Sequence, residues 1–131
     1  MIHIPDKTVL PSGVVCIGWL HPDYPYPQGV VPPEFVLRLR EFALQWPESL
    51  AALGWDLKRG CHACGYCGQE WRMGSFGVPA GDRVFYAPAL IAHFVERHGY
   101  APPAEFVAAV LSCPLPIAPE YVEAVKDLAA R

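Results

Sequence analysis

Apolar residues recur with a helical period in the segment between Pro33 and Pro47. Spacings of one, three or four residues place them on one face of a helix: Phe35, Val36, Leu39, Phe42, Ala43 and Trp46. Pro33 suits the first turn, where its missing N–H has no partner, and we expect Pro47 to end the helix. A short second helix is expected at about Glu48–Leu53.

The same period predicts three further helices. The first is expected to begin at Pro88 and to end at Gly99, with one apolar face made of Leu90, Ile91, Phe94 and Val95. A fourth helix is predicted at about Ala104–Leu111, and a fifth from about Glu120. A proline followed by a glutamate in the first turn is typical of helix starts, and the pattern occurs at residues 32–36, 102–107 and 119–122.

Two other patterns predict strands. The continuous apolar run Val14–Leu20 is typical of a buried strand. Ser75–Val78 and Arg83–Tyr86 flank a Pro-Ala-Gly-Asp turn and predict a hairpin. Between strand and helix, His21–Pro33 carries five prolines and must be a loop. This loop either folds back over the core or presents its two tyrosines to a partner.

These elements predict a small α+β protein. With 131 residues, of which 53% are hydrophobic, the chain is long enough to bury one core, and we expect residues 1–131 to form a single domain. In this arrangement a central hairpin and the helix after it pack against several short helices and the N-terminal strand.

Three of the five cysteines lie within the sequence GCHACGYCG, residues 60–68. Cys61 with Cys64, and Cys64 with Cys67, form two overlapping C-x-x-C pairs, a spacing that lets two thiolates face one point. We favour Cys64 and Cys67 because they enclose the flexible Gly65, and keep Cys61 as an alternative ligand. No signal peptide is visible, so we expect a cytoplasmic, reducing environment, where clustered cysteines more often bind metal than form disulfides.

His93 and His98, in HFVERH, add a pair with the spacing H-x4-H. A cysteine turn, then a hairpin, then a helix with two histidines resembles the zinc finger with two cysteine and two histidine ligands. The resemblance covers residues 61–98 and assigns Cys64, Cys67, His93 and His98 as zinc ligands. It departs from the family in the gap of 25 residues between Cys67 and His93, against about 12 in a DNA-reading finger.

Four protein ligands leave no open position for water, so the implied zinc is structural and would clamp a subdomain at about residues 60–100. Binding of one ion by both histidines sets a condition on the geometry of their helix. On an ideal α-helix, residues five apart point about 140° away from each other. His93 and His98 can share one ion only if the last turn of their helix is distorted, and the following Gly99 makes an irregular end expected.

The remaining features bear on function. The net charge of −3 argues against duplex DNA as a partner, and no apolar stretch is long enough to span a membrane. No motif of a catalytic triad, a P-loop or a metalloprotease is present. We therefore expect a non-enzymatic binding or protein-interaction module with structural zinc, whose partner is an unidentified protein or small molecule.

Two alternatives stay open. The first is a nucleic-acid-binding zinc-finger protein, for single strands rather than duplexes, because Tyr66, Trp71 and Arg72 could stack on bases. The second, less favoured, is an enzyme that uses zinc or the thiol of Cys61. The whole chain is also similar to small bacterial proteins of unknown function with a zinc-finger-like core, a resemblance that implies no activity.

Overall fold

The computed structural model describes residues 3–53, 61–68 and 71–129. Its main sheet has three strands in the order β1-β5-β4, in which β1 is parallel and β4 antiparallel to β5. Their bounds are Val15–Cys16 for β1, Ser75–Ala80 for β4 and Arg83–Pro88 for β5. A separate antiparallel hairpin pairs β2 (Cys61–Ala63) with β3 (Trp71–Met73).

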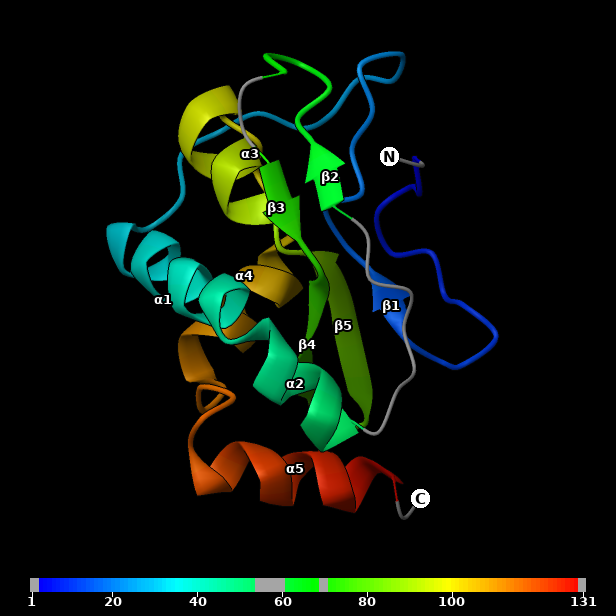
Figure 1. Ribbon diagram of the computed structural model, residues 1–131, viewed down its shortest axis with the longest axis vertical. Coiled ribbons are helices and arrows are strands. Elements are labelled where there is room, and N and C mark those ends of the chain that lie inside the picture. Colours follow the sequence, from blue (N-terminus) through cyan, green and yellow to red (C-terminus); the bar gives the residue numbers. More distant parts are fainter. Residues whose placement is uncertain (1–2, 54–60, 69–70, 130–131) are drawn as a thin grey trace.

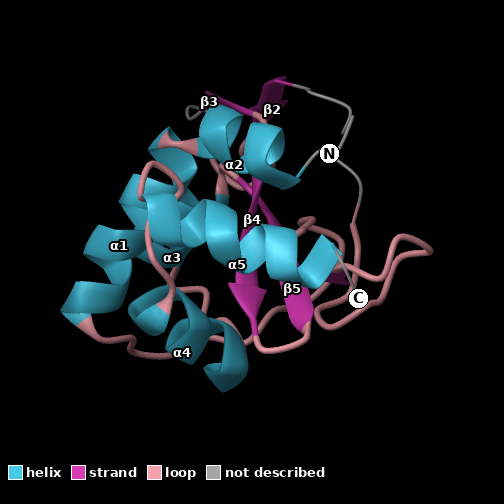
Figure 2. Cartoon of the chain, turned by 90° about the horizontal axis from the view of Figure 1, so that it is seen from below, coloured by secondary structure: helices cyan, strands magenta, loops and turns pink. Residues whose placement is uncertain are grey.

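Helices cover this sheet and confirm the α+β class. They are α1 (Pro33–Leu44), α2 (Trp46–Leu53), α3 (Ile91–His98), α4 (Ala104–Ser112) and α5 (Pro119–Ala129). In Figure 1, α1 and α4 lie on the β4 side of the sheet, and the N-terminal segment lies beyond β1. The view from below in Figure 2 shows α5 beneath the sheet, where it contacts α2 and β4. No helix in the described ranges has the length and apolar character needed to cross a bilayer.

The core lies mainly between the helices and one face of the sheet. Its largest fully buried side chains include Phe35, Phe42, Phe76, Phe94, Phe106, Tyr100 and Tyr121. A smaller cluster on the other face contains Val14, Cys16, Trp19, Val84 and Tyr86. Each such side chain contributes about 1.5–3 kcal/mol when it leaves water, so β5, which is buried on both faces, anchors the fold.

The predicted strand Val14–Leu20 is buried as expected, but only Val15–Cys16 is β-strand. The reason is Gly18, whose φ of +80° turns the backbone and whose N–H donates to the Asp6 carboxylate at 3.0 Å. A Cβ at this position would lie 2.5 Å from Cδ1 of Ile91, so only glycine fits. A contact with a distant helix therefore ends the strand.

Two predicted helix boundaries are wrong, and both involve proline. Pro47 does not end the first helix: α1 stops at Leu44, and Pro47 lies in the first turn of α2, where its missing N–H is tolerated. Helix α3 begins at Ile91, because Pro88 completes β5 opposite Ser75. The predicted end of this helix at Gly99 is confirmed, and α4 and α5 lie within one residue of their predicted bounds.

The predicted hairpin is confirmed, with longer strands that enclose a two-residue turn, Gly81-Asp82. Its outer strand, β4, is a sheet edge whose free backbone groups need partners. Ser49 of α2 and Tyr121 of α5 supply them at Gly77: the Gly77 N–H donates to Ser49 Oγ at 2.8 Å, and the Tyr121 hydroxyl donates to the Gly77 carbonyl at 2.8 Å. Ser49 and Tyr121 also bond to each other at 2.8 Å.

We expect Ser49→Ala to lower the free energy of unfolding by about 1–3 kcal/mol, because it leaves the buried Gly77 N–H without an acceptor. Urea denaturation measures this change. Ser112→Ala is the matched control: its exposed hydroxyl bonds only to the Ala108 carbonyl one turn back, so a loss below about 0.5 kcal/mol is expected. Equal urea midpoints for the two variants would contradict the role given to Ser49.

Candidate metal centre

The two cysteines favoured by sequence lie on the loop of the β2–β3 hairpin. Cys64 follows β2 directly, and the Gly68 N–H donates to the Cys64 carbonyl at 2.8 Å, which closes a tight turn around Cys67. The cysteines thus stand on a hairpin of their own, separate from β4–β5. The sequence did not predict this hairpin, because its strands are three residues each and show no alternation.

Several residues considered in the sequence cannot be placed in the site. The backbone of Cys61 pairs with Met73 in the β2–β3 hairpin, but its side chain lies outside the described part of the chain. The same holds for the side chains of His62, Trp71 and Arg72. The predictions for Cys61 as an alternative ligand, and for a base-stacking surface at Trp71 and Arg72, stay predictions.

The histidines come from α3, and the end of this helix is distorted as predicted. The N–H of Gly99, which caps the helix at a φ of +66°, bonds to the carbonyl of Phe94, five residues back rather than four. A turn closed in this way is wider than an α-turn and brings residues five apart toward one face. The rings of His93 and His98 consequently lie 4.9 Å apart, centre to centre.

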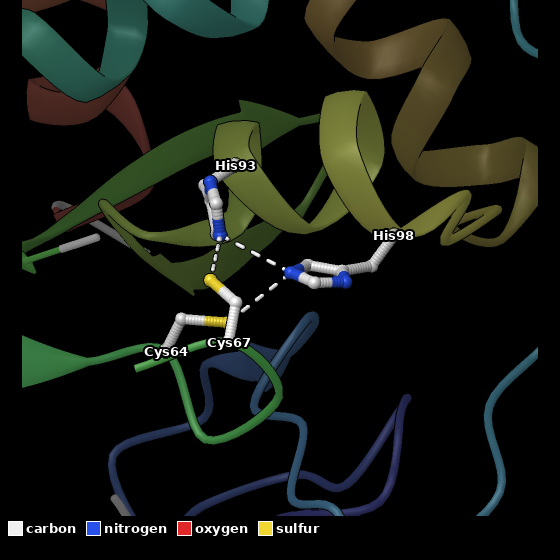
Figure 3. A group of neighbouring side chains, drawn as sticks. All are labelled: Cys64, Cys67, His93 and His98. Atoms are coloured by element: carbon white, nitrogen blue, oxygen red, sulfur yellow. Dashed lines mark hydrogen bonds between the residues drawn. The ribbon is translucent and has the colours of Figure 1, made fainter. Parts of the chain in front are cut away.

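Figure 3 shows both rings turned toward the cysteine turn. Nε2 of His98 lies 3.3 Å from Sγ of Cys64, and Nε2 of His93 lies 3.4 Å from Sγ of Cys67. The two Nε2 atoms are 3.2 Å apart. All four ligand atoms lie within 4.8 Å of one another. Cys64, Cys67, His93 and His98, called the cysteine–histidine cluster below, therefore form a group that can hold one metal ion.

Hydrogen bonds alone do not account for this geometry. A neutral imidazole nitrogen has a single site in the ring plane, either a lone pair or an N–H. Each Nε2 here faces two close atoms, a sulfur and the other ring nitrogen. Direct bonds can satisfy only one contact at each nitrogen, whereas a cation at the centre satisfies all four ligand atoms at once.

Aromatic side chains pack around the cluster from two directions. Tyr66, between the cysteines, lies against the His98 ring at 5.3 Å and against Phe94 at 6.0 Å. Burial raises the pKa of its hydroxyl, which stays neutral and has no hydrogen-bond partner among the described residues. From the proline-rich loop, Tyr26 packs on Tyr66 and donates its hydroxyl to the His98 carbonyl at 2.8 Å.

The loop at residues 21–33 accordingly folds back over the cluster at Tyr26, which is one of the two roles considered for it. Its other tyrosine, Tyr24, stays 51% exposed and stacks on His3 with ring centres 4.0 Å apart. Within the cluster Cys64 is only 1% exposed, whereas Cys67 lies at the surface.

Thiol chemistry elsewhere in the described chain is suppressed. Burial raises the pKa of both the Cys16 and the Cys113 thiol to about 11, so neither forms an appreciable fraction of the nucleophilic thiolate at neutral pH. These two cysteines act as small apolar core residues.

A family described as a domain of unknown function (DUF7919) has a profile that matches residues 4–111. The chain belongs to this family. The DUF7919 match contains the whole cysteine–histidine cluster and every strand of the main sheet, so the site lies inside the family's own domain. No curated protein and no solved structure matches the chain.

We expect the purified protein to contain one metal ion per chain, and Cys64→Ser to lose it, because this substitution removes a buried ligand. Elemental analysis of protein purified without added metal measures both values. Cys113→Ala is the control, since it removes a buried cysteine far from the cluster and should keep the metal. A full metal complement in Cys64→Ser would show that Cys64 is not a ligand.

Proposed function

We propose that the cysteine–histidine cluster binds a structural zinc ion, and that the chain is a non-enzymatic binding module stabilised by this ion. The observation that carries the proposal is the convergence of two sulfur and two nitrogen atoms from segments more than twenty residues apart in sequence. Mixed sulfur and imidazole ligands in this number suit zinc better than iron or the hard cations.

Three of the six distances between the ligand atoms are close to those of a tetrahedral zinc site. Zinc bonds of about 2.3 Å to sulfur and about 2.05 Å to nitrogen require separations of about 3.6 Å between sulfur and nitrogen and about 3.4 Å between the two nitrogens. The corresponding contacts are 3.3 and 3.4 Å for Sγ to Nε2, and 3.2 Å for Nε2 to Nε2. Displacements of about 0.3 Å or less would bring these contacts to the tetrahedral values.

A structural role follows from the number of ligands. A catalytic zinc keeps one position for water or substrate, and four protein ligands fill all positions of a tetrahedral site. Binding by the cluster would fasten the β2–β3 turn to the end of α3. Among the described residues, the other contacts of the turn are made through the Tyr66 ring, which packs on Tyr26 and Phe94, through the buried Cys64, and through Pro22, which packs against the Gly65 backbone. The ion would thus supply much of the energy that fixes the turn.

Zinc removal should lower the melting temperature by about 10 °C or more, since an ion bound at about a thousand times its dissociation constant adds about 4 kcal/mol. Hydrogen exchange should increase at residues 61–68 and 91–98 and change least in β4 and β5. Calorimetry and exchange mass spectrometry, before and after chelation with verified metal loss, measure the two effects. An unchanged melting curve would contradict a structural role.

The partner is proposed to be a protein or a small molecule rather than duplex DNA. The net charge of −3 provides no general attraction for phosphate. On α3, Glu96 forms an ion pair with Arg40 of α1, so this helix carries a carboxylate where a phosphate-binding helix would favour a free cation.

We therefore expect no submicromolar binding to mixed-sequence duplexes at about 150 mM salt. Fluorescence anisotropy with labelled duplex and single-stranded oligonucleotides measures this affinity. Duplex binding at that level would contradict the proposal. Binding confined to single strands would instead support the nucleic-acid alternative and give Trp71 and Arg72 a role.

A further inference from the structure

A cleft of about 350 Å³ opens at the end of the main sheet that is remote from the cysteine–histidine cluster. It lies where the β4–β5 turn, the N-terminal segment and the start of α4 meet. The residues that line it are Lys7, Val15, Ala80, Arg83, Phe85 and Glu105. Val15 and Phe85 are paired in the sheet and, with Ala80, form the apolar part of the lining; the three charged side chains form the rest. Sites for small ligands have this composition, and their volumes begin at about 300 Å³.

The charges of the lining do not cancel. Lys7 Nζ forms an ion pair with Glu105 Oε2 at 3.2 Å, which joins the N-terminal segment to α4. The hydrogen bond from Lys7 is the main cause that lowers the pKa of Glu105, so this carboxyl is ionised at neutral pH. Arg83 forms no ion pair with any residue that the structure describes. Two cations and one carboxylate leave the guanidinium of Arg83 uncompensated.

The backbone at Lys7 departs from ordinary geometry. Lys7 has a φ of +70°, the sole positive value at a non-glycine residue within the described ranges. It occupies the third position of the turn Pro5–Thr8, closed by the Thr8 N–H on the Pro5 carbonyl at 3.2 Å. At such a position glycine or asparagine is favoured. Residues held in such a strained conformation are often found at binding sites, where the function of the side chain outweighs the cost of the backbone strain.

We propose that this cleft binds a small organic monoanion, a carboxylate with an apolar body. The carboxylate pairs with the Arg83 guanidinium, whose planar donors match its two oxygens. The aromatic or short aliphatic body packs on Val15 and Phe85. Glu105 has two effects: it holds Lys7 at the cleft, and its negative charge disfavours a second charge on the ligand, so a carboxylate binds better than a phosphate dianion.

This proposal names a class of ligand for the binding module proposed above. It rests on that proposed function only in assuming that the chain is a binding module. The cleft and the cysteine–histidine cluster share no residue and lie at opposite ends of β5. Metal content and ligand binding can therefore be measured separately on the same sample, and the failure of one leaves the other standing.

The test is a titration of the metal-loaded 131-residue chain, in which binding is monitored by amide chemical shifts. Phenylacetate is the probe, with phenylacetamide as its neutral counterpart and phenyl phosphate as the dianion. We expect saturable shifts with phenylacetate around Lys7, Arg83 and Glu105, and at least about tenfold weaker binding of the amide, because a charge-assisted pair is worth about 1.5–3 kcal/mol. Phenyl phosphate should bind more weakly than phenylacetate.

Arg83→Gln should weaken phenylacetate binding at least about tenfold without altering the fold, since the side chain is exposed. Lys126→Gln is the matched control: it also removes one positive charge, from an exposed position on α5 outside the cleft, and should leave binding unchanged. The proposal is overturned if phenylacetate causes no saturable shifts up to about 10 mM, a very weak affinity for a site of this kind. Equal affinity for the amide, or for Arg83→Gln, overturns it as well.

Discussion

The contact between a two-cysteine turn and the end of one short helix is the constraint on which this structure depends most. Four ligand atoms, two from the β2–β3 loop and two from α3, lie within 4.8 Å of one another. Two tyrosines pack around the cluster. The Tyr66 ring lies against the His98 ring, and the Tyr26 hydroxyl donates to the His98 carbonyl. The proline-rich loop, the turn and the helix thereby become one layer at one end of the sheet.

That arrangement requires an irregular helix. A regular α-helix would point His93 and His98 about 140° apart. The closure of α3 at Gly99, by a bond that reaches back five residues, removes this conflict. The left-handed conformation that Gly99 adopts is costly for other residues, so the glycine that ends the helix also sets the direction of the second histidine. The backbone conformation at the end of α3 thus bears directly on the position of His98 in the cluster.

The sequence predicted that Cys64, Cys67, His93 and His98 come together, because the signals for this grouping are local. C-x-x-C and H-x4-H are spacings within one turn and one helix, and the need for a distorted helix end followed from arithmetic on those spacings. The features it missed depend on contacts between distant segments. Gly18 ends β1 because Ile91 of α3 packs on it, and Pro88 ends a strand rather than beginning a helix because Ser75 pairs with it. The β2–β3 strands are too short to carry a period.

The second site could not be predicted from sequence for the same reason. Lys7, Arg83 and Glu105 are far apart along the chain and belong to no motif; parallel pairing of β1 with β5 and the ion pair from Lys7 to Glu105 bring them together. The sequence gives no sign of the positive φ at Lys7, because lysine normally avoids this backbone conformation. The two ends of β5 thus differ in chemistry, with the cysteine–histidine cluster beyond one end and the guanidinium of Arg83 at the other.

We propose that the four side chains of the cysteine–histidine cluster hold one zinc ion with no other ligand. X-ray absorption at the zinc edge of the purified protein tests it most directly, since it counts the atoms bound to the ion and measures their distances. We expect two sulfur neighbours at about 2.3 Å and two imidazole nitrogens at about 2.0–2.1 Å, with no oxygen bound to the ion. A spectrum without zinc, or one dominated by oxygen neighbours, would contradict it.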